Sequence, residues 1–428
     1  LIFIYFLVGF LTTVNGQCQA PLKIAFLMHA GELKNTFITL ISFSFFLAYL
    51  LNGTLGYKWI NKFGYKKTLI RGLLVMVWGL TVFFFSSWFT VRYENLNVLI
   101  AGAHIPYGYF IFLFGSYLMG TSATLLQVVI NPYVAAYEVK GTQPVQRMNI
   151  VCAFNSFGTT IAPFFVTGVM FGGLAIEEVQ VKQLMVPFLI LAAFIAFTAF
   201  ITQRLYLPDV MHTKGAKGEK LERSIWSFRH LTLGVIAIFF YVGAEVSIGV
   251  NVNLNALELE NSGQTLSFFG MKHIVIGGID FGLPALLATL YWGGLMVGRI
   301  VSSYLKHISP RIQLTVTTIL AASFTLIALV TNNLWLLVTV GLFHSVMWGC
   351  IFTLAITGLN KYTSKASGVF MMGVFGGAVF PFLQGILADS WGSWQYTWIL
   401  VVICELVMLY YALLGSKIRK TDEVENTP

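Results

Sequence analysis

Residues 157–164, FGTTIAPF, return 218 residues later as FGGAVFPF at 375–382. In both copies a glycine stands second and a proline follows five positions later: Gly158 and Pro163, then Gly376 and Pro381. Short matches between segments rich in Phe and Gly also arise by chance, but these two fall on the fifth apolar segment of each half of the chain. The repeat therefore favours a duplicated fold.

The composition around the repeat is typical of a membrane protein. Hydrophobic residues make up 57% of the 428, Phe occurs 38 times and charged residues are only 10%, far from the values of a soluble globular domain. A formal net charge of +9 would suggest nucleic acid in a soluble protein, whereas in a membrane protein it reports Lys and Arg on the cytoplasmic side. We expect a polytopic protein that contacts the lipid bilayer and binds no nucleic acid.

Apolar runs of about 18 residues or more, separated by Gly, Pro and charged residues, predict twelve transmembrane helices and an all-α membrane protein. The predicted spans are 1–28, 34–60, 67–91, 107–137, 147–172, 185–206, 229–255, 282–306, 312–331, 333–361, 366–390 and 396–415. The longest charged stretch divides them into two six-helix halves. The predicted domains are an N-terminal half at 1–207, a cytoplasmic linker at 208–228, a C-terminal half at 229–415 and a cytoplasmic tail at 416–428.

Positive charges predict on which side the two ends lie. An even number of spans puts both termini on one side of the membrane. If that side is cytoplasmic, the cytoplasmic segments and their flanks hold 21 of the 26 Lys and Arg residues. The other side keeps Lys23, Lys34, Arg92, Lys182 and Lys272. This asymmetry follows the positive-inside tendency, so we expect cytoplasmic termini. We also expect the chain to begin at or inside its first span, with a signal peptide as the alternative.

Glu245 is an acid in the middle of an apolar helix. It lies in YVGAEVSIG at 241–249, with no basic residue within ten positions on either side. A carboxylate costs about 2.5–3.5 kcal/mol at the centre of a span, so such acids usually face a cavity or a partner. The functional interpretation is a group that binds and releases a cation; the alternative is a protonated glutamate hydrogen-bonded for packing alone. Glu405 in span twelve is the second acid at this depth, where we expect a structural role or a position beside lipid.

Neutral amides gather at similar depth. Gln127 of span four and Asn155 of span five fall at one level if the two helices pack antiparallel, and Asn15 and Gln17 flank Gly16 in span one. Amides offer both donors and acceptors, as a hydroxyl-rich solute requires. Each alone is more often a contact between helices than a ligand contact. Together they predict a site for a neutral sugar.

Aromatic and imidazole side chains lie near the same level. Trp292, Trp348 and Tyr241 are candidates for stacking on a sugar ring. Because aromatic residues are 15% of the chain, packing alone is the alternative for each. His344 in span ten is a further candidate, either sharing a proton with Glu245 or simply hydrogen-bonded.

Other functions lack the groups that they need. The sequence has no HExxH, GxSxG or P-loop motif, which leaves proteolysis, lipase chemistry and ATP-driven pumping without support. The four cysteines show no metal-ligand spacing, and we expect no cofactor, no metal and no disulfide. Lys23, Arg147 and Arg299 lie nearer the ends of their spans, so we expect no cation at mid-depth that would bind a carboxylate or phosphate substrate.

Six stretches carry a family resemblance. They are NKFGYKKTLI at 61–70, TLLQVVINPYVAA at 124–136, RMNIVCAFNSFGTTIAP at 147–163, YVGAEVSIG at 241–249, YWGGLMVGR at 291–299 and GGAVFPFLQGILAD at 376–389. The chain resembles, over almost its whole length, the fucose-galactose-glucose:proton symporters of the major facilitator superfamily. The first stretch is shared widely across the superfamily, whereas NPYV and FNSFGTTIAP are specific to this branch.

The resemblance implies symport of a neutral monosaccharide with a cation, through one cavity between two halves that expose it alternately. The sugar would be a hexose, deoxyhexose or N-acetylhexosamine, and the protein a monomer in the bacterial cytoplasmic membrane. Asn155 matches an asparagine that contacts sugar in the family. Gln127 stands where the fucose permease has a glutamate, and VNGQCQAP at 14–21 lacks an aspartate that the permease carries. Glu245 stands where glucose/galactose-type members have glutamate, so our hypothesis is that it couples cation to sugar.

Three functions stay open from the sequence. A symporter coupled to protons, or alternatively to sodium, would accumulate sugar, whereas an uncoupled facilitator would only equilibrate it. A membrane sensor that binds sugar without moving it would be expected to carry a signalling domain, for which 416–428 is short. The segment 256–281 either forms a lid or extends the helices on both sides.

Overall fold

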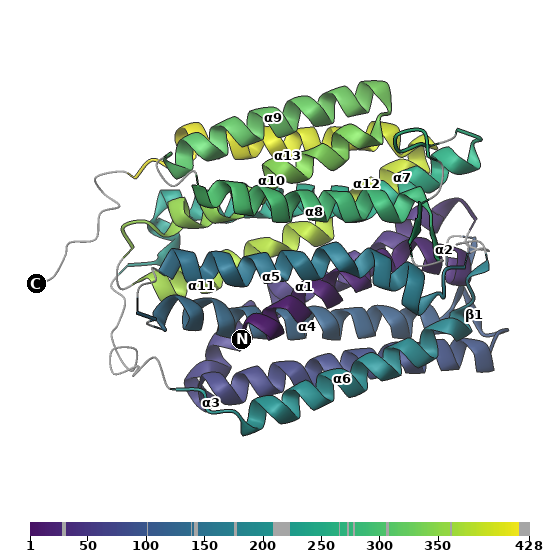
Figure 1. The fold of residues 1–428 in the computed structure, drawn as a ribbon, viewed down its shortest axis with the longest axis horizontal. Coiled ribbons are helices and arrows are strands. Elements are labelled where there is room, and N and C mark those ends of the chain that lie inside the picture. The colour runs from purple at the N-terminus through teal and green to yellow at the C-terminus, as the bar shows by residue number, and fades with distance from the viewer. Residues whose placement is uncertain are drawn as a thin grey trace, which may run out of the picture.

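Helices make up most of the chain (Figure 1). The computed structural model describes residues 1–27, 31–100, 102–137, 139–140, 144–174, 178–208, 223–264, 266–271, 274–276, 279–304, 308–359 and 362–418. Within them, twelve helical segments are long and apolar enough to cross a membrane. Each lies over one of the predicted spans, so the predicted fold class is confirmed.

The elements follow one another in the order of the spans. The helices are α1 (Ile2–Gln17), α2 (Gln19–Leu27), α3 (Lys34–Arg92), α4 (Tyr107–Ala136), α5 (Pro144–Phe165), α6 (Met185–Arg204), α7 (Arg229–Asn261), α8 (Leu283–Tyr304), α9 (Pro310–Thr331), α10 (Leu334–Ile356), α11 (Thr363–Met372), α12 (Gly376–Trp391) and α13 (Ile399–Tyr410). The strands are β1 (Asn97–Ile100), β2 (Ala103–Pro106), β3 (Ile274–Ile276) and β4 (Ile279–Phe281).

Spans and helices do not correspond one to one. α3 holds two spans, and the chain turns between them at Gly64, whose φ of 80° and ψ of 170° interrupt the helix. A positive φ is readily available only to glycine. α1 and α2 together form the first span, and α11 and α12 form the eleventh, joined by the 3₁₀ turn η7 (Gly373–Phe375).

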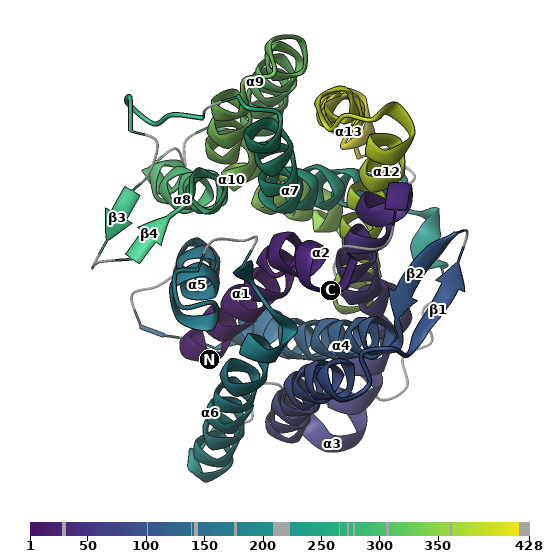
Figure 2. The same ribbon diagram turned by 90° about the vertical axis from the view of Figure 1, so that its right-hand side faces the viewer.

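We call α1 to α6 the first group and α7 to α13 the second. In Figure 2, α1, α4, α5 and α6 lie on one side of the view, and α7 to α10, α12 and α13 lie on the other. The first group meets the second where α5 packs against α8 and where α3 packs against α11 and α12. The antiparallel hairpins β1–β2 and β3–β4 lie at one end of the helices, which we call the hairpin end. The opposite end, where α6 ends at Arg204 and α7 begins at Arg229, is the linker end.

The glycines of the internal repeat make equivalent contacts. A Cβ atom on Gly158 of α5 would lie 2.5 Å from the carbonyl oxygen of Phe6 in α1, and one on Gly376 of α12 would lie 1.6 Å from that of Phe239 in α7. At both places only glycine lets the two backbones touch. Span five therefore packs on span one as span eleven packs on span seven, which supports the duplication that the repeat suggested.

Two sequence expectations concern the connections. Of the segment 256–281, the first residues extend α7 to Asn261, and the short hairpin β3–β4 precedes α8. The predicted cytoplasmic linker lies largely outside the described residues, since 209–222 are not among them. The division into domains at 207 and 229 stays a prediction.

Candidate functional site

A central cavity of about 130 Å³ lies between the two groups. A buried water needs about 10–15 Å³ on this measure, so the cavity has room for about ten waters or for a small solute. Its walls come from α1, α3, α4 and α5 on one side and mainly from α7, α8 and α10 on the other. Six of the predicted site residues line it, namely Asn15, Gln127, Asn155, Glu245, Trp292 and Trp348.

The three amides in the wall are each fixed by a hydrogen bond. Asn155 Nδ2 donates to the carbonyl oxygen of Tyr5 at 2.9 Å, and Gln127 Nε2 donates to the Tyr49 hydroxyl at 2.8 Å. Asn15 Oδ1 accepts from the Ser116 hydroxyl at 2.9 Å. These bonds hold each amide in place, and the amides' other polar atoms remain to bind a solute.

Glu245 is held by the tyrosine one turn earlier on α7. The Tyr241 hydroxyl donates to Glu245 Oε1 at 2.9 Å and also lies 3.0 Å from the carbonyl oxygen of His344. A phenol has a single proton and donates to one acceptor at a time. Protonated Glu245 donates to Tyr241 and frees the phenol for the carbonyl, whereas ionised Glu245 competes with the carbonyl for that proton. The hydrogen bonding at Tyr241 is therefore sensitive to the charge on Glu245.

Arg299 reaches the central cavity, where no cation that would bind an anionic substrate was expected. Its guanidinium lines the central cavity, although its Cα lies near the end of α8, because the side chain is long. Nη1 donates to the carbonyl oxygen of Cys152 at 3.2 Å and to the Ser156 hydroxyl, both on α5. Among the described residues that line this cavity, Glu245 and Arg299 are the only charged side chains.

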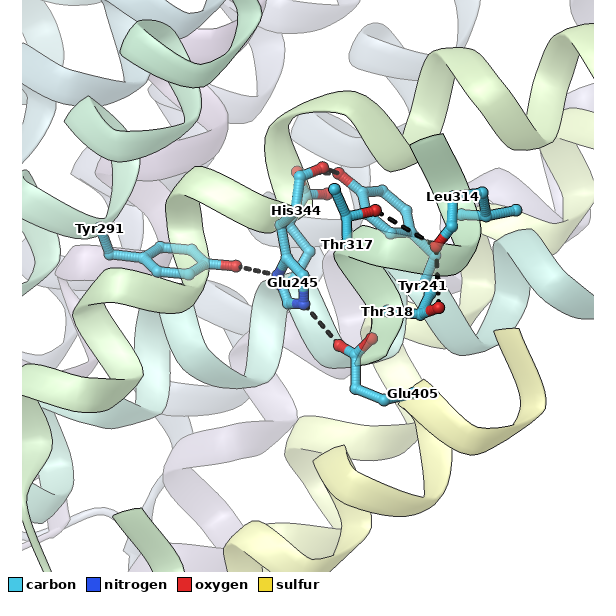
Figure 3. Close-up of polar contacts among 8 residues, drawn as sticks. All are labelled: Tyr241, Glu245, Tyr291, Leu314, Thr317, Thr318, His344 and Glu405. Atoms are coloured by element: carbon cyan, nitrogen blue, oxygen red, sulfur yellow. Dashed lines mark hydrogen bonds and ion pairs between the residues drawn. The ribbon is translucent and has the colours of Figure 1, made fainter. Parts of the chain in front are cut away.

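His344 lies behind the cavity wall and does not line the cavity. Figure 3 shows its ring between Tyr291 and Glu405: Nδ1 lies 2.7 Å from the Tyr291 hydroxyl and Nε2 lies 2.6 Å from Glu405 Oε1. The side chains of His344 and Glu405 are both fully buried. The ring therefore pairs with Glu405 and not with Glu245. Of the two alternatives expected for Glu405, a position beside lipid is wrong, and a structural role agrees with its burial.

The buried pair links three helices of the second group. His344 belongs to α10, Glu405 to α13 and Tyr291 to α8. Removing one member of such a buried pair leaves the other without its partner, which is costly. Sequence position alone could not reveal this pair, because the two residues are 61 apart.

Gln17 also lies off the central cavity. Its Nε2 donates to the carbonyl oxygen of Gly249 at 3.0 Å, and its Oε1 accepts from Asn253 Nδ2, so it joins α1 to α7 on the hairpin side of the cavity. A second contact between the groups lies at the hairpin end. There Asp389 of α12 accepts from the backbone N–H of Asn35 at 3.2 Å and of Thr36 at 2.6 Å, at the start of α3.

Trp292 and Trp348 both reach the central cavity. The indole Nε1 of Trp292 is buried and makes no hydrogen bond with the described residues, so it is a donor without an acceptor in this conformation. Trp348 packs edge to face on Tyr241, with the ring centroids 6.3 Å apart. The two indoles supply the aromatic surface expected from the sequence, in the wall formed by the second group.

The chain has relatives of known name along most of its length. A family model described as the Major Facilitator Superfamily matches residues 2–375. A glucose/galactose transporter of Brucella abortus biovar 1 (strain 9-941) is 31% identical over 420 residues, which cover 97% of this chain and 92% of the relative. The L-fucose-proton symporter of Escherichia coli (strain K12) is 23% identical over 419 residues, or 91% and 87% of the two chains.

Solved structures share the fold. The crystal structure of a variant of the E. coli fucose:proton symporter matches with a TM-score of 0.64 and 20% identity, over 97% of both chains. The inward-open xylose transporter from E. coli matches with a TM-score of 0.63 and 12% identity, over 99% of this chain and 98% of that one. At these identities the likeness concerns the arrangement of helices alone.

Proposed function

This chain belongs to the major facilitator superfamily, and we propose that it carries a neutral monosaccharide across a bacterial cytoplasmic membrane together with a cation, first of all a proton. The observation that carries this proposal is the combination in one cavity of three amides, two indoles and, among the described lining residues, a single carboxyl group. The relatives named as glucose/galactose transporters and fucose-proton symporters agree with it.

The charge balance of the cavity supports a neutral substrate. Arg299 adds a positive charge that the sequence argument missed, but its guanidinium already donates to α5, and Glu245 supplies the opposite charge in the same cavity. An anionic substrate would bring a second negative charge into a low-dielectric space that holds one cation. A hexose, deoxyhexose or N-acetylhexosamine brings hydroxyl groups that suit Asn15, Gln127 and Asn155 without adding charge.

Glu245 is proposed as the group that couples cation to sugar. It is the one carboxyl group among the described residues that line the cavity, so a proton bound there changes the charge of the substrate site itself. A symporter gains about 2.3 kcal/mol per charge for each 100 mV of membrane potential, which a neutral sugar alone does not experience. Sodium bound by the carboxylate and nearby amides is the alternative, and the experiment that closes the Discussion separates the two.

Contacts at both sides of the cavity support alternating access. On the hairpin side, Gln17 binds α7 and Asp389 binds the start of α3; on the linker side, Arg299 binds α5. Opening the cavity toward one side of the membrane requires the groups to part at that end only. We place the linker end and both termini in the cytoplasm, from the distribution of Lys and Arg, and a monomer is sufficient because one chain encloses the cavity.

The substrate class can be tested by counterflow. Purified protein in liposomes loaded with one sugar would exchange it for labelled glucose, galactose, fucose, mannose or N-acetylglucosamine, with glucuronate as an anionic comparison. We expect exchange of at least one neutral sugar, none of glucuronate, and a KM at least tenfold higher in Asn155→Ala. Ser323→Ala, whose hydroxyl is exposed and bonds only its own helix, is the control. Exchange of glucuronate in preference to every neutral sugar would contradict the proposal.

A further inference from the structure

A second, smaller cavity of about 30 Å³ lies on the hairpin side of the central one. Gln17, Thr167 and Asn253 line it, together with apolar residues of α2, of α5, of the segment that follows α5 and of the first turn of α8. At about 10–15 Å³ for each water, it holds two or three waters and is too small for a sugar in this conformation. The amides of this second cavity lie where the two groups of helices meet. Gln17 belongs to the first group and Asn253 to the second.

A bridge of amides separates the two cavities. Gly16 and Val250 line the central cavity, whereas Gln17 and Asn253 line the second, one turn or less further along α1 and α7. The bridge consists of two hydrogen bonds: Gln17 Nε2 donates to the Gly249 carbonyl oxygen, and Asn253 Nδ2 donates to Gln17 Oε1. α1 and α7 approach closely here, since a Cβ atom on Gly16 would lie 2.9 Å from Val250 Cγ2. A solute that passes between the cavities has to break the bridge.

The bridge leaves hydrogen-bonding capacity unused. Asn253 is only 5% exposed, and its Oδ1 has no hydrogen-bond partner among the described residues. Buried acceptors without a donor are uncommon and costly. Asn251 and Asn255 of the same helix also carry a buried Oδ1 without a partner among the described residues, but of the three only Asn253 lines a cavity, where a ligand hydroxyl can supply the missing donor.

We propose that Gln17 and Asn253 form a second subsite for the transported monosaccharide, occupied when α1 and α7 part at the hairpin end. The subsite rests on the proposed function, since it takes the same sugar as the central cavity. A sugar hydroxyl donates and accepts at once, so it can replace the bonds of the bridge and also reach the free Asn253 Oδ1. The sugar thereby helps to open the bridge, because its hydroxyl groups replace the hydrogen bonds that are broken. A closure made of apolar side chains would have no hydrogen bonds for the sugar to replace.

The test compares uptake from the two ends of the molecule. Liposomes with the hairpin end outside and liposomes with the linker end outside are prepared, and the KM for the best sugar of the counterflow panel is measured in each. Asn253→Val removes the amide and keeps the volume similar. We expect its KM to rise about fivefold, the loss of roughly one hydrogen bond, for sugar arriving from the hairpin end. The KM from the linker end stays within twofold of wild type, which also shows that the variant is folded.

Asp389→Asn is the matched control for closure. It weakens the contact between α12 and α3 at the same end and does not line either cavity, so its effect reports how easily this end opens. The subsite is contradicted if Asn253→Val has the wild-type KM from the hairpin end, or if the two variants shift that KM equally and in the same direction. If wild-type protein moves no sugar, the proposed function fails first, and counterflow detects that separately.

A second substitution at Asn253 distinguishes loss of sugar binding from misfolding. Asn253→Ser keeps a short donor and acceptor and should recover at least half of the affinity that Asn253→Val loses. If Asn253→Ser is as impaired as Asn253→Val from both ends, the residue is structural and the subsite is wrong.

Discussion

Tyr241 donates a 2.9 Å hydrogen bond to Glu245, one helical turn further along α7, and the same hydroxyl lies 3.0 Å from the carbonyl oxygen of His344. The carboxyl group that faces the cavity is thus tied through one phenol to α10. A change in the charge of Glu245 changes which acceptor the phenol serves, and so changes a contact between two helices of the second group. Tyr241→Phe removes this link without removing the acid.

Tyr241→Phe should slow concentrative uptake and spare exchange. The variant loses the hydrogen bond to Glu245, and if Glu245 is ionised in part of the cycle, as proposed, that bond corresponds to about 1.5–3 kcal/mol. We expect accumulation about tenfold slower and counterflow within threefold of wild type, both measured with labelled sugar in liposomes. Equal loss of both activities would show that the tyrosine serves the fold or the sugar and not the coupling.

Arg299→Gln should impair transport more than Arg299→Lys. Gln removes the positive charge that balances Glu245, and its shorter side chain loses the hydrogen bonds to α5. Lys keeps the positive charge but lacks the planar guanidinium that donates two hydrogen bonds at once. We expect initial rates of counterflow at least tenfold lower for Gln and intermediate for Lys. Arg229→Gln, at the exposed start of α7, is the control. A wild-type rate of counterflow in Arg299→Gln would show that transport does not require the charge of Arg299 or its contact with α5.

His344→Leu should be strongly destabilising, and His344→Leu combined with Glu405→Leu should be much less so. Removing one member of a buried pair leaves the other unpaired and costs about 3–5 kcal/mol, whereas an apolar replacement of both is often tolerated. Thermal unfolding of the detergent-solubilised protein would show the difference as a lowered Tm in the single variant that the double variant partly recovers. A double variant with a Tm as low as that of the single variant, or lower, would contradict the pairing of His344 with Glu405.

Glu405→Gln should leave coupling intact. Gln keeps a hydrogen-bonding side chain against His344 but cannot carry a proton as a carboxyl group does. Because the pair lies behind the wall of the cavity, we expect accumulation within threefold of wild type, measured under an imposed pH gradient. If Glu405→Gln abolishes accumulation and retains exchange, the transported proton binds at this pair.

Gly376→Ala should prevent folding, because its Cβ atom would clash with the helix packed against it. Gly158→Ala should prevent folding for the same reason, at the equivalent contact of the first group. The added Cβ atom meets a backbone carbonyl oxygen in both cases, so neither clash can be relieved by a side-chain rotation. Yield of monodisperse protein after size-exclusion chromatography is the measurement. Gly349→Ala is the matched control, because a Cβ atom there meets nothing within 4 Å and alanine favours the helix. Normal yield of Gly376→Ala would contradict the packing described.

Most of the fold could be predicted from the sequence, because each span is a continuous apolar run. The repeat FGTTIAPF and FGGAVFPF favoured a duplicated fold, and the structure adds that its two glycines make equivalent contacts. Gln127 and Asn155 were expected at one level, and both line the central cavity. The correct predictions used features that are local in the chain, such as apolar runs, or the antiparallel packing of consecutive helices.

The errors came from contacts between distant segments. Arg299 was placed by the position of its Cα near the end of a span, but the side chain extends toward the cavity and α5. Glu405 was expected to have a structural role or to lie beside lipid; it is fully buried against His344, a partner on another helix that its own segment does not reveal. Gln17 was expected in the central site, yet it binds α7 beside Asn253, and no periodicity within span one reveals that neighbour. The sites themselves remain predictions that the experiments above address.

The most direct test of the account is sugar accumulation by Glu245→Gln under an imposed pH gradient and, separately, under an imposed sodium gradient. Glu258→Gln, an acid of the same helix bonded to Trp394 outside both cavities, is the control. We expect the pH gradient to drive accumulation in wild type and in Glu258→Gln, whereas Glu245→Gln exchanges sugar and does not concentrate it. Accumulation driven by sodium alone would assign the carboxylate to a sodium site. Wild-type accumulation by Glu245→Gln under the pH gradient would contradict the central claim.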